Sequence, residues 1–98
     1  MFTNYVRYSP IGEYLRMCII ERLAKGPATV VELDNLAKES IDRLGVRYNW
    51  KVWPELLRRE VVIVDGVATL SDYGKVLYRE AYGEIRQYLN KALGLEKT

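Results

Sequence analysis

The sequence lacks histidine altogether and has a single cysteine and a single glutamine among its 98 residues. Histidine is the commonest general base and metal ligand in proteins, so its absence removes the usual means of acid–base catalysis and metal binding. Cys18 falls on an apolar helical stripe without a histidine partner, which argues against a thiol nucleophile and a zinc site. No glycine-rich phosphate loop and no G-x-S-x-G motif is present. We therefore expect a protein that is not an enzyme and that uses no metal and no other cofactor.

Long apolar runs are also absent. None approaches the roughly 20 residues that a bilayer-spanning helix needs, and no signal-peptide pattern is visible, so no membrane association is expected. One unpaired cysteine fits a reducing interior and a cytoplasmic location. A hydrophobic content of 49% beside 29% charged residues is typical of one globular domain, here residues 1–98. Many charges and few amides favour a thermophilic source.

Positive charge is concentrated in residues 43–59. This segment holds five of the 15 basic residues and one of the 13 acidic ones, so it carries +4 while the remainder carries −2. Cations neutralise phosphates, and the flat and amide side chains between them can contact bases, so the segment has the chemistry of a nucleic-acid-binding element. A structural interpretation stands beside it, in which the arginines are a solvated face and the apolar residues are core: Trp50, Val52, Trp53, Leu56 and Leu57.

The first helix is predicted over residues 10–25, after an aromatic tail at 1–9. Ser9 is a good cap, Pro10 suits the first helical position, and Gly26 with the following proline ends the helix. The apolar residues that follow helical spacing are Ile11, Tyr14, Leu15, Cys18, Ile19 and Leu23. The charged residues placed elsewhere on the helix are Glu13, Arg16, Glu21 and Arg22.

The second helix opens with a capping box formed by Thr29 and Glu32. Its end has two alternatives: near Ser40, or at Gly45, which would serve as a left-handed terminator and place Arg43 in the last turn.

The third helix is predicted at about 49–60, with Asn49 as its cap. Pro54 falls one turn in, so either the helix is kinked there or Trp50 to Trp53 form a separate turn and the regular helix begins at Pro54. The predicted three-helix core thus covers residues 10–60.

A hairpin at 61–70 and a long helix at 71–93 complete the chain. The β-branched run Val61–Val64 comes before Asp65-Gly66, a strong hairpin signal, and Val67–Leu70 after it is the second strand. Ser71 caps the last helix and Gly94 ends it. This helix carries more apolar and aromatic surface than one side of a small domain covers, which favours a homodimer, although the tyrosines could instead skirt the core. The predicted interface residues are Tyr78, Tyr82, Ile85, Leu89 and Leu93.

This order of elements resembles the winged helix-turn-helix domains, an α+β, mainly α fold. Residues 26–33 look like the family's entry into its second helix, and Trp53, Leu56, Val61 and Val62 look like its spaced apolar positions. Residues 70–74, Leu-Ser-Asp-Tyr-Gly, are similar to its L-[ST]-x-x-G exit from the wing. The likeness covers roughly residues 10–93 and is greatest to small archaeal or bacterial regulators that dimerise through an added C-terminal helix. Here Glu60 stands where the family often has glycine, and the wing, Val61 to Ser71, has no lysine or arginine.

The resemblance implies a dimeric, transcription-regulating protein that binds double-stranded DNA sequence-selectively, with the third helix in the major groove. The candidate contacts to groove, phosphate or base edges are Arg43, Arg47, Tyr48, Asn49, Lys51, Arg58 and Arg59. Two other hypotheses remain open: a winged-helix module that binds protein rather than DNA, and an architectural protein that coats DNA without sequence preference.

Overall fold

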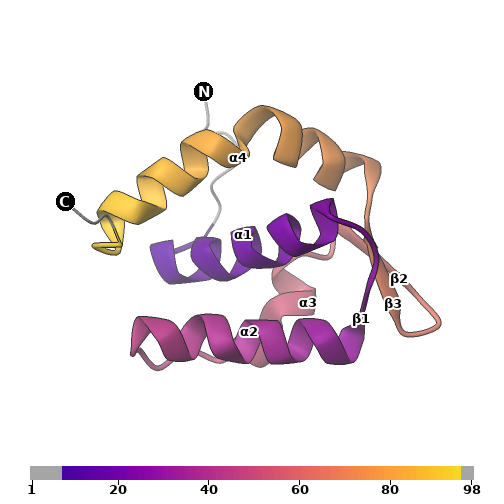
Figure 1. Ribbon diagram of the computed structural model, residues 1–98, viewed down its shortest axis with the longest axis horizontal. Coiled ribbons are helices and arrows are strands. Elements are labelled where there is room, and N and C mark those ends of the chain that lie inside the picture. Colours follow the sequence, from indigo (N-terminus) through magenta and orange to yellow (C-terminus); the bar gives the residue numbers. More distant parts are fainter. Residues whose placement is uncertain (1–7, 96–98) are drawn as a thin grey trace.

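The computed structural model describes residues 8–95 as four α-helices and a small antiparallel sheet (Figure 1). The elements in chain order are α1 (Pro10–Ala24), β1 (Ala28–Thr29), α2 (Val30–Leu44), the 3₁₀ turn η2 (Trp50–Val52), α3 (Trp53–Leu56), β2 (Val61–Val64), β3 (Val67–Leu70) and α4 (Asp72–Ala92). The predicted α+β, mainly helical class is confirmed. The aromatic tail at 1–9 lies outside the described residues up to position 7.

Helix α1 is the centre of the molecule and lies between α4 and α2 (Figure 1). Every residue from 12 to 20 is buried, including Glu13 and Arg16 with no exposed side-chain surface. These two charges were placed outside the predicted apolar stripe, and the structure shows that this part of the helix is also buried. Met17 and Ile20 extend the apolar surface beyond the predicted stripe, and a helix that is apolar on most sides is buried on all of them.

The predicted helix caps are confirmed. The Ser9 hydroxyl accepts a hydrogen bond from the Gly12 amide at 3.4 Å. Thr29 accepts from the Glu32 amide at 3.1 Å, and the Glu32 carboxylate accepts from the Thr29 amide at 3.0 Å. Helix α2 follows the longer of its two alternatives, because it continues to Leu44 and ends at Gly45, whose φ of 68° is left-handed.

The sheet has the strand order β1-β3-β2, with both neighbours antiparallel. Asp65 and Gly66 form the two-residue turn with φ values of 51° and 75°, as a tight hairpin requires. The hairpin is confirmed, and the short strand β1 adds a third member to the sheet that the sequence analysis did not include. The Val30 amide donates to the Gly66 carbonyl at 2.9 Å and so ties the hairpin turn to the start of α2.

The third helix is much shorter than the predicted 49–60. The 3₁₀ turn η2 precedes Pro54, α3 ends at Leu56, and residues 57–60 form turns. Proline has no amide hydrogen to donate to the preceding turn, so a regular helix can only begin around it. Trp53 holds this short element in place, because its indole is fully buried and its Nε1 donates to Asp34 Oδ1 at 2.8 Å.

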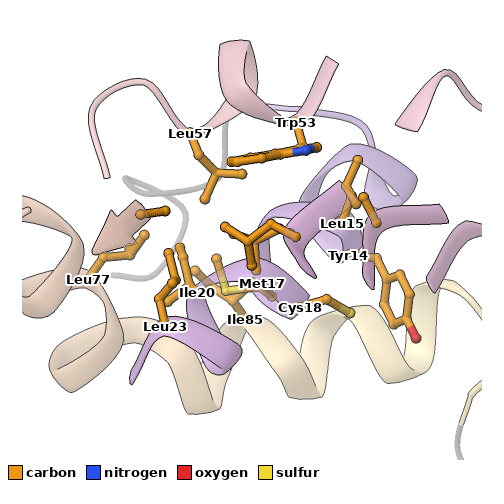
Figure 2. Close-up of a cluster of buried hydrophobic side chains, with 14 of the residues drawn as sticks. Tyr14, Leu15, Met17, Cys18, Ile20, Leu23, Trp53, Leu57, Leu77 and Ile85 are labelled. Atoms are coloured by element: carbon orange, nitrogen blue, oxygen red, sulfur yellow. The ribbon is translucent and has the colours of Figure 1, made fainter. Parts of the chain in front are cut away.

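Helix α4 packs along α1 and completes the core. Leu57 and Trp53 from one side and Leu77 and Ile85 from the other converge on α1 (Figure 2). Ile85 and Leu89, predicted to contact a partner subunit, have no exposed surface in the single chain, so they belong to its own core. The apolar stripe of α4 that suggested a dimer is therefore largely covered by α1, which itself has apolar residues on both sides.

No helix within residues 8–95 is both long enough and apolar enough to cross a bilayer.

Candidate nucleic-acid interface

The five cations of the segment 43–59 are all exposed to solvent: Arg43, Arg47, Lys51, Arg58 and Arg59. Within residues 8–95, no ion pair involves any of them. The ion pairs that do form use Arg16, Arg22, Lys38 and Arg79. In the described part of the chain the positive charge of the segment thus has no direct counter-ion and is open to an external anion.

Lys51 and Arg58 flank the short helix α3, one on η2 and the other in the turn that follows α3. The backbone between these two cations is anchored to the hydrophobic core, because the side chains of Trp53 and Leu57 are fully buried. Lys51 Nζ lies 5.7 Å from the centroid of the Trp50 ring, within the range of a cation–π contact. The two cations are therefore carried by backbone that the core fixes, and their charged ends are exposed to solvent.

Arg47 and Arg59 precede and follow Lys51 and Arg58 along the chain. Arg47 is exposed in the connection between α2 and η2. The guanidinium carbon of Arg59 is 5.1 Å from the centroid of the Tyr73 ring, so Arg59 leans toward the first turn of α4. The Arg59 carbonyl accepts a hydrogen bond from the Ser71 hydroxyl at 2.6 Å, which fixes the backbone at this position. We call Arg47, Lys51, Arg58 and Arg59 the basic segment.

Arg43 differs from the other four in its surroundings. Its guanidinium donates to the Ser40 hydroxyl at 3.3 Å. Burial raises the pKa of Tyr14, and the positive charges of Arg43 and Arg86 partly offset that rise. Arg43 is therefore an electrostatic neighbour of Tyr14 on α1. Arg43 stands apart from α3 and is not counted in the basic segment.

Tyr48 is placed against the body of the protein rather than toward a ligand. A β-carbon built on Gly12 would lie 3.0 Å from the Tyr48 hydroxyl, so this hydroxyl sits over the first turn of α1. Burial, with Tyr8 and Glu13 nearby, raises the pKa of Tyr48. Tyr48 is a candidate for base-edge or positioning contacts, and the inward position of its hydroxyl favours the positioning role.

Asn49 serves as a cap, as the sequence predicted. Its Oδ1 accepts a hydrogen bond from the Lys51 amide at 3.2 Å and so begins η2. A bidentate contact to adenine needs both the oxygen and the nitrogen of the amide group. Because the oxygen is already engaged, Asn49 positions Lys51 and is a poor candidate for base reading.

A buried ionic cluster fixes the end of this surface to α1, and the sequence interpretation missed it. The Arg16 guanidinium lies 2.8 Å from Glu13 Oε1 and 2.5 Å from Glu60 Oε2. Burial lowers the pKa of Arg16, but the two carboxylates outweigh that effect and the net shift is upward. The Tyr8 amide donates to Glu13 Oε2 at 3.0 Å. The only signals in the sequence were the Glu13–Arg16 spacing and an acid directly before an apolar strand.

No group of histidine, cysteine, aspartate or glutamate side chains within residues 8–95 is arranged to hold a metal ion. A cleft of about 570 Å³ lies among the end of α1, β3 and the start of α4. Its lining includes the apolar residues Leu23, Pro27 and Leu70, and its polar members are Thr69, Lys75 and Tyr78. These side chains offer no nucleophile paired with a base, so the cleft has no evident catalytic chemistry.

The remaining predicted interface residues lie on α4 as follows. Tyr78 is 38% exposed and its ring centroid is 4.9 Å from that of Tyr82. Tyr82 is half-buried, and burial together with the Glu21 carboxylate of α1 raises its pKa. Leu93 is partly buried against the core. Only Tyr78 of the five therefore offers a large exposed side chain.

Comparisons with models of protein families, with curated proteins and with solved structures give no match for this chain.

Proposed function

We propose that this protein binds double-stranded DNA through the basic segment, Arg47, Lys51, Arg58 and Arg59. The observation that carries the proposal is that four cations within thirteen residues are exposed and have no ion pair in the described part of the chain. Lysine and arginine side chains in this state gain free energy from phosphates, since each contact releases a counter-ion from the nucleic acid.

The element order supports the same proposal. Helix, short strand, helix, helix, hairpin and helix is the order of a winged helix-turn-helix domain, in which α3 would be the DNA-facing helix and β2–β3 the wing. Gly74 also supports this assignment, because the family-like motif of residues 70–74 forms the connection from the hairpin into α4. The family assignment is part of the proposal.

The short α3 changes the expected manner of binding. Four helical residues span about 6 Å, which is half the width of the major groove. Tyr48 and Asn49 are engaged by the protein itself, and the described wing, Val61–Leu70, has no cation. Few groups remain to read base edges. We therefore propose that contacts to phosphates dominate, which favours an architectural role over sequence-selective regulation.

A titration with fluorescently labelled duplexes tests this proposal. Several unrelated 20-base-pair sequences should bind with dissociation constants within about tenfold of one another, since phosphate contacts carry no sequence information. With about four phosphates neutralised, the logarithm of the binding constant should fall with the logarithm of the salt concentration with a slope of about −3.6. No binding at about 50 mM salt, or a binding constant that salt leaves unchanged, would rule the proposal out.

A protein-binding module is the second candidate, and the exposed apolar residues of the wing favour it. Val62, Ile63 and Val64 are 46%, 44% and 62% exposed. The two candidates differ in a simple measurement: a DNA-binding protein is retained on random duplex or heparin at low salt and elutes as salt rises. A module that binds only protein passes through both columns.

A further inference from the structure

Strand β2 is an exposed apolar strand at an open edge of the sheet. All four of its residues, Val61–Val64, are β-branched and apolar, and the last three are more than 40% exposed. The strand order places β2 at one edge, and within residues 8–95 no other strand pairs with its outer side. Soluble proteins usually protect such an edge with a charge, a proline or a bulge. Strand β2 has none of these, so its edge is available for pairing.

The hydrogen-bond pattern indicates which groups face outward. The two-residue turn makes Val64 and Val67 a hydrogen-bonded pair, and pairs alternate along an antiparallel ladder. Val62 and Thr69 therefore bond to each other, while the backbone of Ile63 points to the open edge. The Val61 amide is already bonded to the Leu57 carbonyl at 2.9 Å. The Ile63 amide and carbonyl are thus the central unpaired groups of the edge.

The ends of β2 carry opposite charges. Arg58 and Arg59 precede the strand, and Asp65 follows it in the turn; all three are exposed. When two identical strands pair side by side in opposite directions, the start of each lies beside the end of the other. The arginines of one copy then lie near Asp65 of the second copy at both ends, while the four apolar residues of each strand meet in the middle.

We propose that a second copy of this chain pairs with β2 through its own β2, antiparallel, to give a homodimer with a continuous six-stranded sheet. The strand is complementary to itself in its hydrogen-bonding groups, its apolar side chains and its end charges. It has no polar side chain that would select a foreign segment. Pairing of this kind is symmetric and closes at two copies.

The opposite edge of the sheet does not support an open chain of molecules. Strand β1 at that edge is two residues long, and Pro27 directly before it has no amide hydrogen to donate. Pairing of β2 with β1 of the next molecule would therefore form few hydrogen bonds. The antiparallel β2 pair is favoured, and it replaces α4 as the surface that joins two subunits.

Sedimentation equilibrium of the full chain over about 5–500 µM tests the proposal, because a contact of four residues on each side buries little area and is weak. The average mass should rise from 11.4 kDa toward twice that value. Ile63→Lys, which places a charge at the centre of the edge, should raise the dimer dissociation constant at least about tenfold. Val46→Lys is the matched control, since Val46 is 40% exposed in a connection away from β2. It should leave the constant unchanged.

Two further variants keep the test decisive if Ile63→Lys unfolds. Asp65→Asn keeps a residue that tolerates a left-handed turn and removes the end charge, so it should weaken the dimer at low salt by about threefold. Ile63→Cys should form cross-linked dimers on mild oxidation, whereas Val46→Cys should not; the native thiol, Cys18, is buried. A monomer at every concentration, growth beyond a dimer, or a dimer unaffected by the β2 variants would overturn the proposal. The outcome is independent of DNA binding, which a monomer could also show.

Discussion

Gly74 lies so close to the carbonyl oxygen of Glu60 that a β-carbon at position 74 would overlap it. The same carbonyl accepts a hydrogen bond from the Ser71 amide at 2.8 Å, and the Gly74 amide donates to the Ser71 hydroxyl at 3.0 Å. The start of α4 is therefore joined directly to the turn that ends the α3 region. Glycine is needed in the motif of residues 70–74 because two backbones meet there.

Gly74→Ala should destabilise the protein by about 1–3 kcal/mol, since the added methyl meets backbone that cannot move aside. Gly83→Ala is the matched control in the same helix, with open space around the position. It should stabilise the protein by about 0.5–1 kcal/mol through better helix propensity. Urea unfolding of the two variants measures both changes, and equal effects would contradict the proposed backbone contact.

Arg16→Met should cost about 3–5 kcal/mol, because it leaves the carboxylates of Glu13 and Glu60 buried without their cation. Replacing both acids by glutamine in the same chain should recover much of that loss. Lys38→Ala removes an ion pair that is exposed on both sides and should leave the unfolding midpoint unchanged. If Arg16→Met and Lys38→Ala behaved alike in denaturant titrations, the ionic cluster would not be a structural element.

Asp34→Ala should destabilise the protein by about 1–3 kcal/mol, since it leaves the buried Trp53 indole nitrogen without an acceptor. Asp34→Asn retains an oxygen at the same place and should cost less. Asp42→Ala on the exposed side of α2 is the control for loss of an acid from this helix. Tryptophan emission during unfolding reports on all three, and an Asp34→Ala variant as stable as the parent would contradict the role of this bond.

Stability should fall as pH rises above about 10, where tyrosines ionise in the unfolded chain. Burial and the Glu21 carboxylate raise the pKa of Tyr82 in the folded chain, so the folded state keeps a proton that the unfolded state releases. The contribution of Tyr82 to the free energy of unfolding is therefore fully present below pH about 10 and is lost at higher pH. Tyr82→Phe should show a smaller loss of stability between pH about 9 and 11. The pKa values of Tyr14 and Tyr48 are also raised, so part of the fall should remain.

The parts of the fold that were predictable from sequence depend on local chemistry. Ser9, the Thr29–Glu32 box and the Asp65-Gly66 turn each act within a few residues, and each appears where it was predicted. The buried charges were missed because Glu60 reaches Arg16 from 44 positions along the chain. A carboxylate that is exposed and one that is paired in the core look alike in sequence.

In the candidate site, too, some features could be predicted from the sequence and others depend on contacts between distant residues. Exposure of the cations could be predicted from their number and spacing, since so many charges cannot all be buried. The inward position of Tyr48 could not, because it depends on the space that Gly12 leaves on α1. The burial of Ile85 and Leu89 within the single chain could not be predicted either, because the apolar stripe of α4 faces an α1 that is apolar on more than one side, a property of two helices together.

DNA binding by the double variant Lys51→Ala, Arg58→Ala, compared with Arg79→Ala, Lys91→Ala on α4, tests the proposed function most directly. Both pairs remove one lysine and one arginine that are exposed, so the net charge changes equally. The Lys51→Ala, Arg58→Ala variant should lose about two units of the salt slope and bind duplex at least about tenfold more weakly, with an unchanged melting temperature. The α4 variant should bind much as the parent does. Equal binding by the two variants would contradict a DNA-binding surface at the basic segment.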